Sequence, residues 1–156
     1  ILRCLVGSEM CIRDRSEDDY VIIHDAARPI VYQDIIDDLI EKAKANGNAC
    51  SAVSCYETVV LTENRTSGKE QIDRNRIVRV QTPQCYNYGL IKSLYEKADK
   101  DNREDFVYAN ILAMNYGVEI YFSKGTNNNI KITTKDDIAL FRALLYYINN
   151  AEGEEN

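Results

Sequence analysis

Short apolar runs alternate along the chain with longer segments in which apolar residues recur at the period of an α-helix. Two runs, 20–24 and 49–55, have the length and residue types of buried strands. Two more, 118–122 and 130–133, are predicted to be extended. The helical period occupies the segments 32–46, 87–98, 104–116 and 134–148. Strands that alternate with helices predict an α/β fold with a mostly parallel sheet.

Several of the predicted helix ends carry residues that favour them. Gly47 and Gly117 follow the first and third helical segments, where a residue in the left-handed conformation ends a helix. Thr134 precedes the last helical segment as a capping residue. Asp136 and Asp137 fall in the first turn of that helix, where the helix dipole favours negative charge.

The segment 57–81 has a different pattern. An extended run at 57–61 is followed by a polar turn at 62–70, and 77–81 alternates apolar and polar residues. We predict a projecting β-hairpin arm, and we expect 82–84 (Thr-Pro-Gln) to interrupt the pattern. The arm has little apolar area to bury on its own, so it is expected to pack on another part of the protein or on a partner subunit.

The two ends of the chain differ from the segment 16–150, which we predict to be one domain. Residues 5–15 match the conceptual translation of a transposon adaptor used to build sequencing libraries. Our hypothesis is that residues 1–15 are a non-native artefact; the alternative is a genuine amino-terminal strand. Residues 151–156 are expected to be an acidic tail with a frayed end.

Composition narrows the classes of function. The chain has 25 acidic and 19 basic residues and a formal net charge of −6. A nucleic-acid-binding protein usually carries an excess of positive charge, so this class of function is disfavoured. No apolar run approaches the length of a membrane span. The five cysteines include no Cys-x-x-Cys spacing, which favours free thiols in a reducing cytoplasm over a disulfide framework or a zinc site.

Four places along the chain put phosphate-competent residues outside the apolar runs. Asp25 and Arg28 follow the first predicted strand, at the end where α/β sheets bind ligands. The other places are Thr58, Arg74 and Lys131. Arginine holds phosphate with a planar fork, lysine offers a point charge, and a carboxylate beside them suits a metal ion. From the pattern alone, Asp25 and Arg28 are equally consistent with a local salt bridge at a strand end.

Five short motifs resemble, in one order, those of a known family. They are 24–29 (His-Asp-Ala-Ala-Arg-Pro), 57–59 (Glu-Thr-Val), 73–75 (Asp-Arg-Asn), 81–84 (Gln-Thr-Pro-Gln) and 129–134 (Asn-Ile-Lys-Ile-Thr-Thr). The set resembles the cytidylyltransferases that act on 2-C-methyl-D-erythritol 4-phosphate or on ribitol 5-phosphate. The resemblance implies a Rossmann-like nucleotidyltransferase domain whose first strands are missing from this sequence.

The resemblance also implies a reaction and a site. CMP passes from CTP to the polyol phosphate, and Ala26-Ala27 favours 2-C-methyl-D-erythritol 4-phosphate over the alternative, ribitol 5-phosphate. Mg²⁺ is the expected cofactor, and the arm is expected to form a homodimer. The implied roles are metal and substrate binding for Asp25, substrate binding for Arg28, Thr58 and Thr82, and catalysis for Arg74 and Lys131.

One departure from the family pattern affects activity. The family's Gly-rich loop, which clasps the triphosphate of CTP, has no match in the sequence. We therefore expect this chain to be inactive or nearly so. His24 is expected to be a hydrogen-bonded core residue without a catalytic role. Two rival functions stay open, a non-catalytic dimerising α/β fragment and a nucleotidyltransferase that charges a sugar 1-phosphate.

Overall fold

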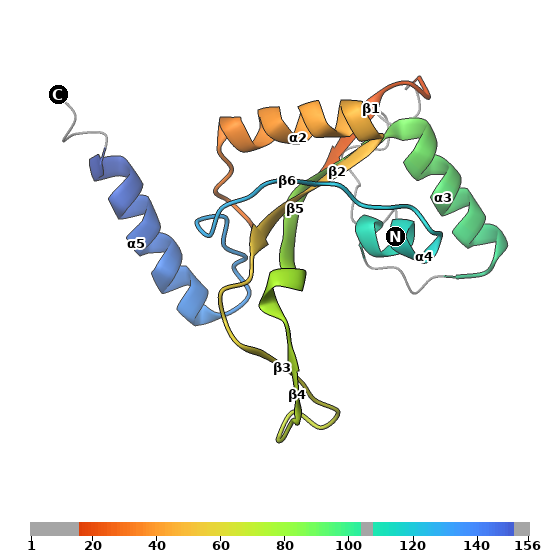
Figure 1. Cartoon of the computed structure of the whole chain (residues 1–156). Coiled ribbons are helices and arrows are strands. Elements are labelled where there is room, and N and C mark those ends of the chain that lie inside the picture. Colours follow the sequence, from red (N-terminus) through yellow and green to blue (C-terminus); the bar gives the residue numbers. More distant parts are fainter. Residues whose placement is uncertain (1–15, 104–107, 152–156) are drawn as a thin grey trace.

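The structure is a computed structural model that describes residues 16–103 and 108–151 (Figure 1). The predictions for residues 1–15 and for the tail beyond Ala151 fall outside the described residues. Within them, helices lie on both faces of a central sheet, and a thin arm projects from one end of the body. The α/β class is therefore confirmed.

The central sheet has four strands within the described residues. They are β1 (Tyr20–Ile23), β2 (Asn48–Ser54), β5 (Val78–Asn87) and β6 (Phe122–Lys124), in the order β1-β5-β2-β6. Three of them, β1, β2 and β6, run in one direction, but only β2 and β6 pair in parallel, so the sheet is mixed instead of mostly parallel. Strand β5 runs the opposite way between β1 and β2, so two of the three strand pairs are antiparallel.

Strand β5 corrects two predictions. The segment 77–81 is not the second strand of the arm, and 82–84 does not interrupt the pattern, because one strand runs through both. Val78 pairs with Ser54 in the central sheet, and the Thr82–Pro83 peptide bond is cis. The sequence pattern did not indicate one strand because its first residues are exposed and residues 81–86 are buried. The alternation of apolar and polar residues therefore stops midway along the strand.

Helix α2 (Gln33–Asn46) covers one face of the sheet and confirms the first helical segment. Ile35, Leu39 and Ala43 recur at spacings of four and form its buried stripe. The helix ends as predicted, because Gly47 adopts a φ of 84°, a left-handed conformation that costs glycine little.

Helices α3 (Tyr88–Lys100) and α4 (Ala109–Asn115) cover the opposite face. Alternate side chains of a strand point to opposite faces of a sheet. Ala49 accordingly packs with α2, whereas Cys50 packs with α3, α4 and Tyr86. The core is thus divided into two layers by the sheet, as in other α/β domains.

Three predicted boundaries on this side of the molecule change. The helix predicted over 104–116 is described only from α4 onward, since residues 104–107 lie outside the described part. The strand predicted over 118–122 is displaced to β6, because the Glu119 carbonyl and the Tyr121 N–H bond the Asn48 side chain instead of the backbone of a neighbouring strand. The segment 130–133 forms no strand, although its Ile132 N–H donates to the Ala27 carbonyl at 2.8 Å.

The arm is a shorter hairpin than predicted. It consists of β3 (Val59–Leu61) paired with β4 (Glu70–Ile72), instead of the whole segment 57–81. A single turn of 3-10 helix at Arg74–Arg76 then leads back to β5. Every residue from 60 to 71 is exposed, which agrees with the predicted lack of self-burial.

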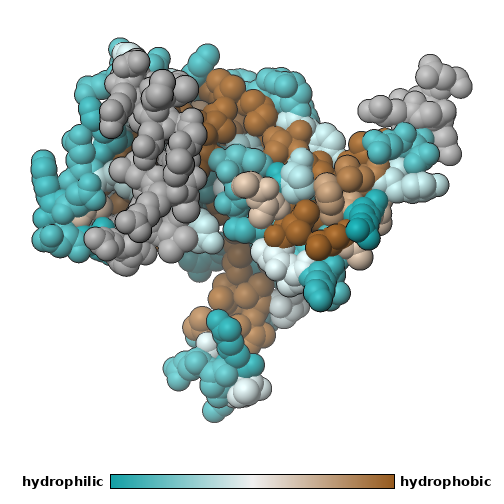
Figure 2. Space-filling view, turned by 180° about the vertical axis from the view of Figure 1, so that it is seen from behind, coloured by the Kyte–Doolittle hydropathy of each residue, from teal (hydrophilic) through white to brown (hydrophobic). Residues whose placement is uncertain are grey.

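Helix α5 (Lys135–Ala151) begins at the predicted cap and stands apart from the sheet (Figure 1). The Asp137 carboxylate accepts the Thr133 and Thr134 N–H groups, and the Thr134 hydroxyl accepts the Asp137 N–H. The helix leaves apolar side chains exposed, and Figure 2 shows them gathered over it. No helix of the described residues is long and apolar enough to cross a membrane.

Candidate active site

The loop after β1 carries two of the predicted site residues, Asp25 and Arg28. The Arg28 N–H donates to the Asp25 carbonyl at 2.9 Å, which closes a tight turn. Asp25 Oδ2 lies 3.0 Å from Lys131 Nζ and 3.5 Å from Arg28 Nε. Lys131 comes from the loop between β6 and α5, more than a hundred residues further along the chain. We call Asp25, Arg28 and Lys131 the Asp25 cluster.

Two neighbours fix the conformation of the β1 loop. The Thr82 hydroxyl of β5 accepts the Asp25 N–H at 3.0 Å and lies 3.1 Å from His24 Nδ1. His24 Nε2 lies 2.8 Å from the Arg28 carbonyl, which only accepts, so this nitrogen donates. In neutral His24, Nδ1 then accepts the Thr82 hydroxyl proton. His24 is hydrogen-bonded as predicted, but it is exposed and so is not the core residue that the sequence predicted.

The Asp25 cluster is half-buried and carries an excess of positive charge. The side chains of Asp25, Arg28 and Lys131 are 25%, 13% and 33% exposed. Two cations face one carboxylate, so an anionic group is attracted to the cluster, and partial burial weakens the screening of that attraction. Lys131 Nζ also lies 5.5 Å from the centroid of the Tyr108 ring, within the range of a cation–π contact.

The other two predicted site residues lie at the base of the arm. Arg74 Nη1 donates to the Tyr56 carbonyl at 3.0 Å, and both Arg74 and Thr58 are exposed. Within the described residues, no hydrogen bond or ion pair joins either of them to the Asp25 cluster. One subunit therefore brings together Asp25, Arg28, Thr82 and Lys131, but leaves Arg74 and Thr58 apart from them.

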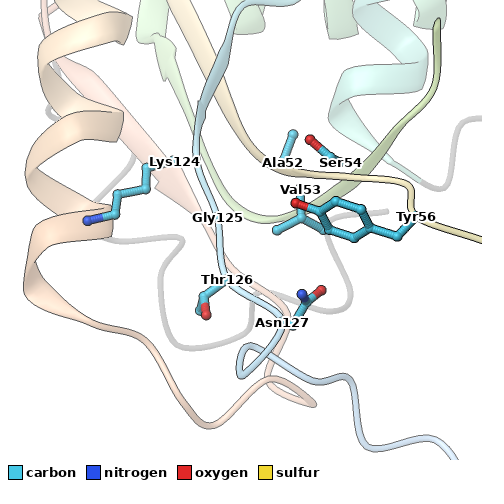
Figure 3. A pocket seen from close by; sticks show the side chains of 8 residues that line it. All are labelled: Ala52, Val53, Ser54, Tyr56, Lys124, Gly125, Thr126 and Asn127. Atoms are coloured by element: carbon cyan, nitrogen blue, oxygen red, sulfur yellow. The ribbon is translucent and has the colours of Figure 1, made fainter. Parts of the chain in front are cut away.

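Two shallow pockets adjoin each other near the arm. The first, of about 410 Å³, is lined by Ala52, Val53, Ser54, Tyr56, Lys124, Gly125, Thr126 and Asn127. Figure 3 shows the Tyr56 ring beside Val53, while the Lys124 side chain points away toward α2. The second, of about 400 Å³, shares Ser54 and Tyr56 with the first and is also lined by Arg74. Neither pocket is lined by the Asp25 cluster.

Lys124, which lines the first pocket, is hydrogen-bonded to two carboxylates of α2. Its ammonium group donates to Asp34, and its backbone N–H donates to Asp38 Oδ2 at 2.6 Å. The hydrogen bond from the ammonium group lowers the pKa of Asp34, and the one from the backbone N–H lowers the pKa of Asp38. These contacts join β6 to α2.

The described residues contain no group of three or more histidine, cysteine or acidic side chains able to hold a metal ion by themselves. Asp25 is the carboxylate nearest to the cationic groups of the cluster. Mg²⁺ in phosphate-transfer sites takes one or two protein carboxylates and completes its shell with substrate phosphates and water. A single Asp25 carboxylate fits that pattern.

Sequence reasoning missed Asn129 and Tyr108 as parts of the site. Asn129 is fully buried, donates from its side chain to the Thr82 carbonyl at 2.7 Å, and accepts Arg28 Nη1 on its own carbonyl at 2.7 Å. Its place within the 129–134 motif was the available signal. Tyr108 follows residues of no distinctive pattern, and nothing in the sequence indicates its contact with Lys131.

The chain resembles known proteins over most of its length. The model of the 2-C-methyl-D-erythritol 4-phosphate cytidylyltransferase (IspD) family matches residues 11–147. A ribitol-5-phosphate cytidylyltransferase of Lacticaseibacillus paracasei is 38% identical over 140 residues, which are 88% of this chain and 58% of that protein. A 2-C-methyl-D-erythritol 4-phosphate cytidylyltransferase of Clostridium novyi is 36% identical over 83% of this chain and 55% of that protein.

A solved structure of the same family has a similar fold. The 2-C-methyl-D-erythritol 4-phosphate cytidylyltransferase of Francisella tularensis superposes with a TM-score of 0.75 at 30% identity, over 84% of this chain and 61% of that one. The fold and these relatives show that the chain is a nucleotidyltransferase by class. More particularly, the chain belongs to the IspD family of cytidylyltransferases. It spans somewhat more than half the length of the curated relatives that it matches.

Proposed function

We propose that the Asp25 cluster is the polyol-phosphate half of a cytidylyltransferase site. In the proposed reaction, a phosphate oxygen of the polyol phosphate attacks the α-phosphorus of CTP. A new P–O–P linkage forms, the bond to the β-phosphate breaks, and pyrophosphate leaves with the electron pair. Such a step depends on placement and charge neutralisation, which a cationic cluster supplies, and it needs no covalent nucleophile.

The observation that carries the proposal is the convergence of Arg28 and Lys131 on one carboxylate. Arg28 would hold the polyol phosphate with its planar fork, and Lys131 would orient the attacking oxygen. Asp25 would exchange its two cationic partners for a Mg²⁺ ion or for polyol hydroxyl groups. Bound Mg²⁺ would neutralise charge on the phosphates. Thr82 would hold the β1 loop in place, since its hydroxyl is hydrogen-bonded to the Asp25 N–H and to His24 Nδ1.

We further propose that Thr58 and Arg74 serve the Asp25 cluster of a partner subunit. In one subunit they lie at the base of an exposed hairpin and make no hydrogen bond or ion pair with the subunit's own cluster among the described residues. The arm exposes Val60 and Leu61 at 47% and 53%, which is apolar area that a second copy could cover. A homodimer would then complete each site with residues of both subunits.

The nucleotide half of the site is not accounted for by this sequence, which has no Gly-rich phosphate loop. We therefore propose that the chain alone binds the polyol phosphate but does not transfer CMP.

We further propose that the protein resides in the cytoplasm. The buried free cysteines Cys50, Cys55 and Cys85 suit that reducing compartment.

For the substrate, we propose 2-C-methyl-D-erythritol 4-phosphate. The family model that matches residues 11–147 is named for that substrate, and Ala26-Ala27 favours it. Ribitol 5-phosphate is the second candidate, since a relative named for it is 38% identical. The two substrates differ in chain length and in one methyl branch, so a direct comparison separates them.

A chimera tests the function. It joins the amino-terminal part of the Lacticaseibacillus paracasei relative, of which this chain covers 58%, to residues 16–156. With CTP and Mg²⁺, pyrophosphate release is expected with 2-C-methyl-D-erythritol 4-phosphate and is expected to fall by about 100-fold or more in Arg28→Ala. Release with ribitol 5-phosphate alone would favour the second candidate. Release with neither, from a folded chimera, would contradict the proposal.

A further inference from the structure

Asn129 connects three segments that are far apart in the sequence. Its carbonyl accepts Arg28 Nη1 at 2.7 Å, which ties it to the β1 loop. Its side-chain amide donates to the Thr82 carbonyl at 2.7 Å, which ties it to β5. It also lies two residues before Lys131, on the loop that brings this lysine to Asp25. Asn129 is 0% exposed.

The Asn129 side-chain hydrogen bond reaches a residue of β5, Thr82, that has no Cα partner in the register with either neighbouring strand. Gln84 pairs with Ile23 on one side and with Cys50 on the other, and the next pair toward the start of β5 is Ala52 with Val80. Thr82 falls within this shift of register. A buried carbonyl that loses its partner costs free energy, so the Asn129 amide is strongly favoured in this position.

The amide bond also determines where the carbonyl of the same residue lies. With its side chain fixed on Thr82, Asn129 has little freedom to rotate its backbone carbonyl away from Arg28. Arg28 is thereby held by a hydrogen bond from Nη1 to the Asn129 carbonyl and by an ion pair with Asp25, in which the buried Nε lies 3.5 Å from the carboxylate without a hydrogen bond. A guanidinium fixed in this way loses less conformational entropy when it binds phosphate.

We propose that Asn129 is a positioning residue, which acts on the phosphate through Arg28 and Lys131 and does not touch it. The inference rests on the proposed function for the meaning of the cluster. The order that Asn129 imposes on Arg28 is a separate property of the protein without ligand, and it is measured separately.

The variant Asn129→Ala removes the amide donor, and Asn129→Ser keeps a shorter donor in case the alanine variant does not fold. Asn48→Ala is the matched control. Asn48 is also buried, at 2% exposed, and its side chain also donates to a backbone carbonyl, that of Glu119 at 3.0 Å. It lies at the amino end of β2, however, and makes no contact with the Asp25 cluster among the described residues.

The first readout is the ¹⁵Nε–H signal of Arg28 in the ligand-free full chain, measured by NMR. We expect a slowly exchanging signal in the wild type and in Asn48→Ala, and fast exchange with water in Asn129→Ala. In Asn129→Ser we expect an intermediate rate. An Arg28 signal that is unchanged in a folded Asn129 variant would overturn the inference.

The second readout is the affinity for 2-C-methyl-D-erythritol 4-phosphate and for ribitol 5-phosphate, measured by calorimetry on the same proteins. We expect Asn129→Ala to weaken binding by about tenfold and Asn48→Ala to leave it unchanged. An equal loss in both variants would reduce Asn129 to a general structural role and overturn the inference. If the wild type binds neither compound, the proposed function fails while the NMR comparison still tests the order of Arg28.

Discussion

At the scale of single residues, the site depends on one carboxylate shared by two cations. Asp25 lies 3.0 Å from Lys131 Nζ and 3.5 Å from Arg28 Nε, so it neutralises part of the charge that would attract a phosphate. The same carboxylate keeps the two cations close together before any ligand binds. Asp25 therefore weakens the binding of a simple anion but keeps Arg28 and Lys131 in fixed positions.

Changing Asp25 to asparagine should separate these two effects. We expect Asp25→Asn to raise the affinity for inorganic phosphate severalfold, because the competing negative charge is removed while the two cations remain. The control Asp37→Asn removes an exposed carboxylate on α2, where it accepts a hydrogen bond from Gln33, and should have no effect. Calorimetric titration with phosphate at low ionic strength measures both. Weaker phosphate binding in Asp25→Asn would contradict this account of the cluster.

The buried cysteines are predicted to be unreactive. Burial raises the pKa of Cys50 to about 12 and the pKa of Cys85 to about 11. The thiolate is the reactive form, so both thiols should resist iodoacetamide at pH 8 in the native protein and react in urea. Peptide mapping by mass spectrometry gives the modified fraction at each site. Rapid native labelling of Cys50 would show that the core around α3 and α4 opens readily.

At the scale of elements, local signals predicted some segments well and others poorly. Helix α2 was predictable because its buried stripe and its terminal Gly47 both lie within the segment itself. Strand β5 was not, because its burial changes midway along its length and its partners lie on two other strands. Likewise, the motifs indicated Asp25, Arg28, Thr82 and Lys131, whereas the contact of Tyr108 with Lys131 arises only from the tertiary fold.

The start of helix α5 should depend on pH. Hydrogen bonds from the Thr133 and Thr134 N–H groups lower the pKa of Asp137 from 3.8 to about 2. A lowered pKa means that the ionised form stabilises the folded state, so the contribution is present above about pH 4 and is lost as the pH falls toward 2. At pH 2.5, we expect the amides in the first turn of α5 to exchange faster than predicted from the pH dependence of the intrinsic exchange rate alone.

The matched variants for this test lie in the same turn. Asp137→Asn should abolish the extra pH dependence, and Asp136→Asn should preserve it, since no hydrogen bond from Thr133 or Thr134 goes to Asp136. Hydrogen exchange followed by NMR resolves the individual amides. Equal behaviour of the two variants would show that the capping carboxylate does not control the start of the helix.

At the scale of the whole molecule, the described chain has two exposed features that a compact monomer would be expected to cover. The arm projects from the body, and α5 stands apart from the sheet (Figure 1). Both carry exposed apolar side chains, including Leu61 and Leu140 at 53% and 51%. The proposed dimer uses the arm and would bring Arg74 of one subunit to the cluster of the other.

Sedimentation tests the role of the arm. The wild-type chain should sediment as a dimer, and the double variant Val60→Lys, Leu61→Lys should sediment as a monomer, because two charges are then placed in the proposed contact. The control Met114→Lys changes an equally exposed apolar residue on α4 and should remain a dimer. A wild-type monomer at micromolar concentration would count against the arm as an interface.

The central claim is that the Asp25 cluster binds a polyol phosphate, and calorimetric titration of the full chain tests it most directly. We expect 2-C-methyl-D-erythritol 4-phosphate or ribitol 5-phosphate to bind in competition with inorganic phosphate. Lys131→Gln should weaken that binding by about tenfold or more, and the control Lys44→Gln, an exposed lysine on α2, should leave it unchanged. Binding of neither compound, or equal binding by the wild type and Lys131→Gln, would contradict the claim.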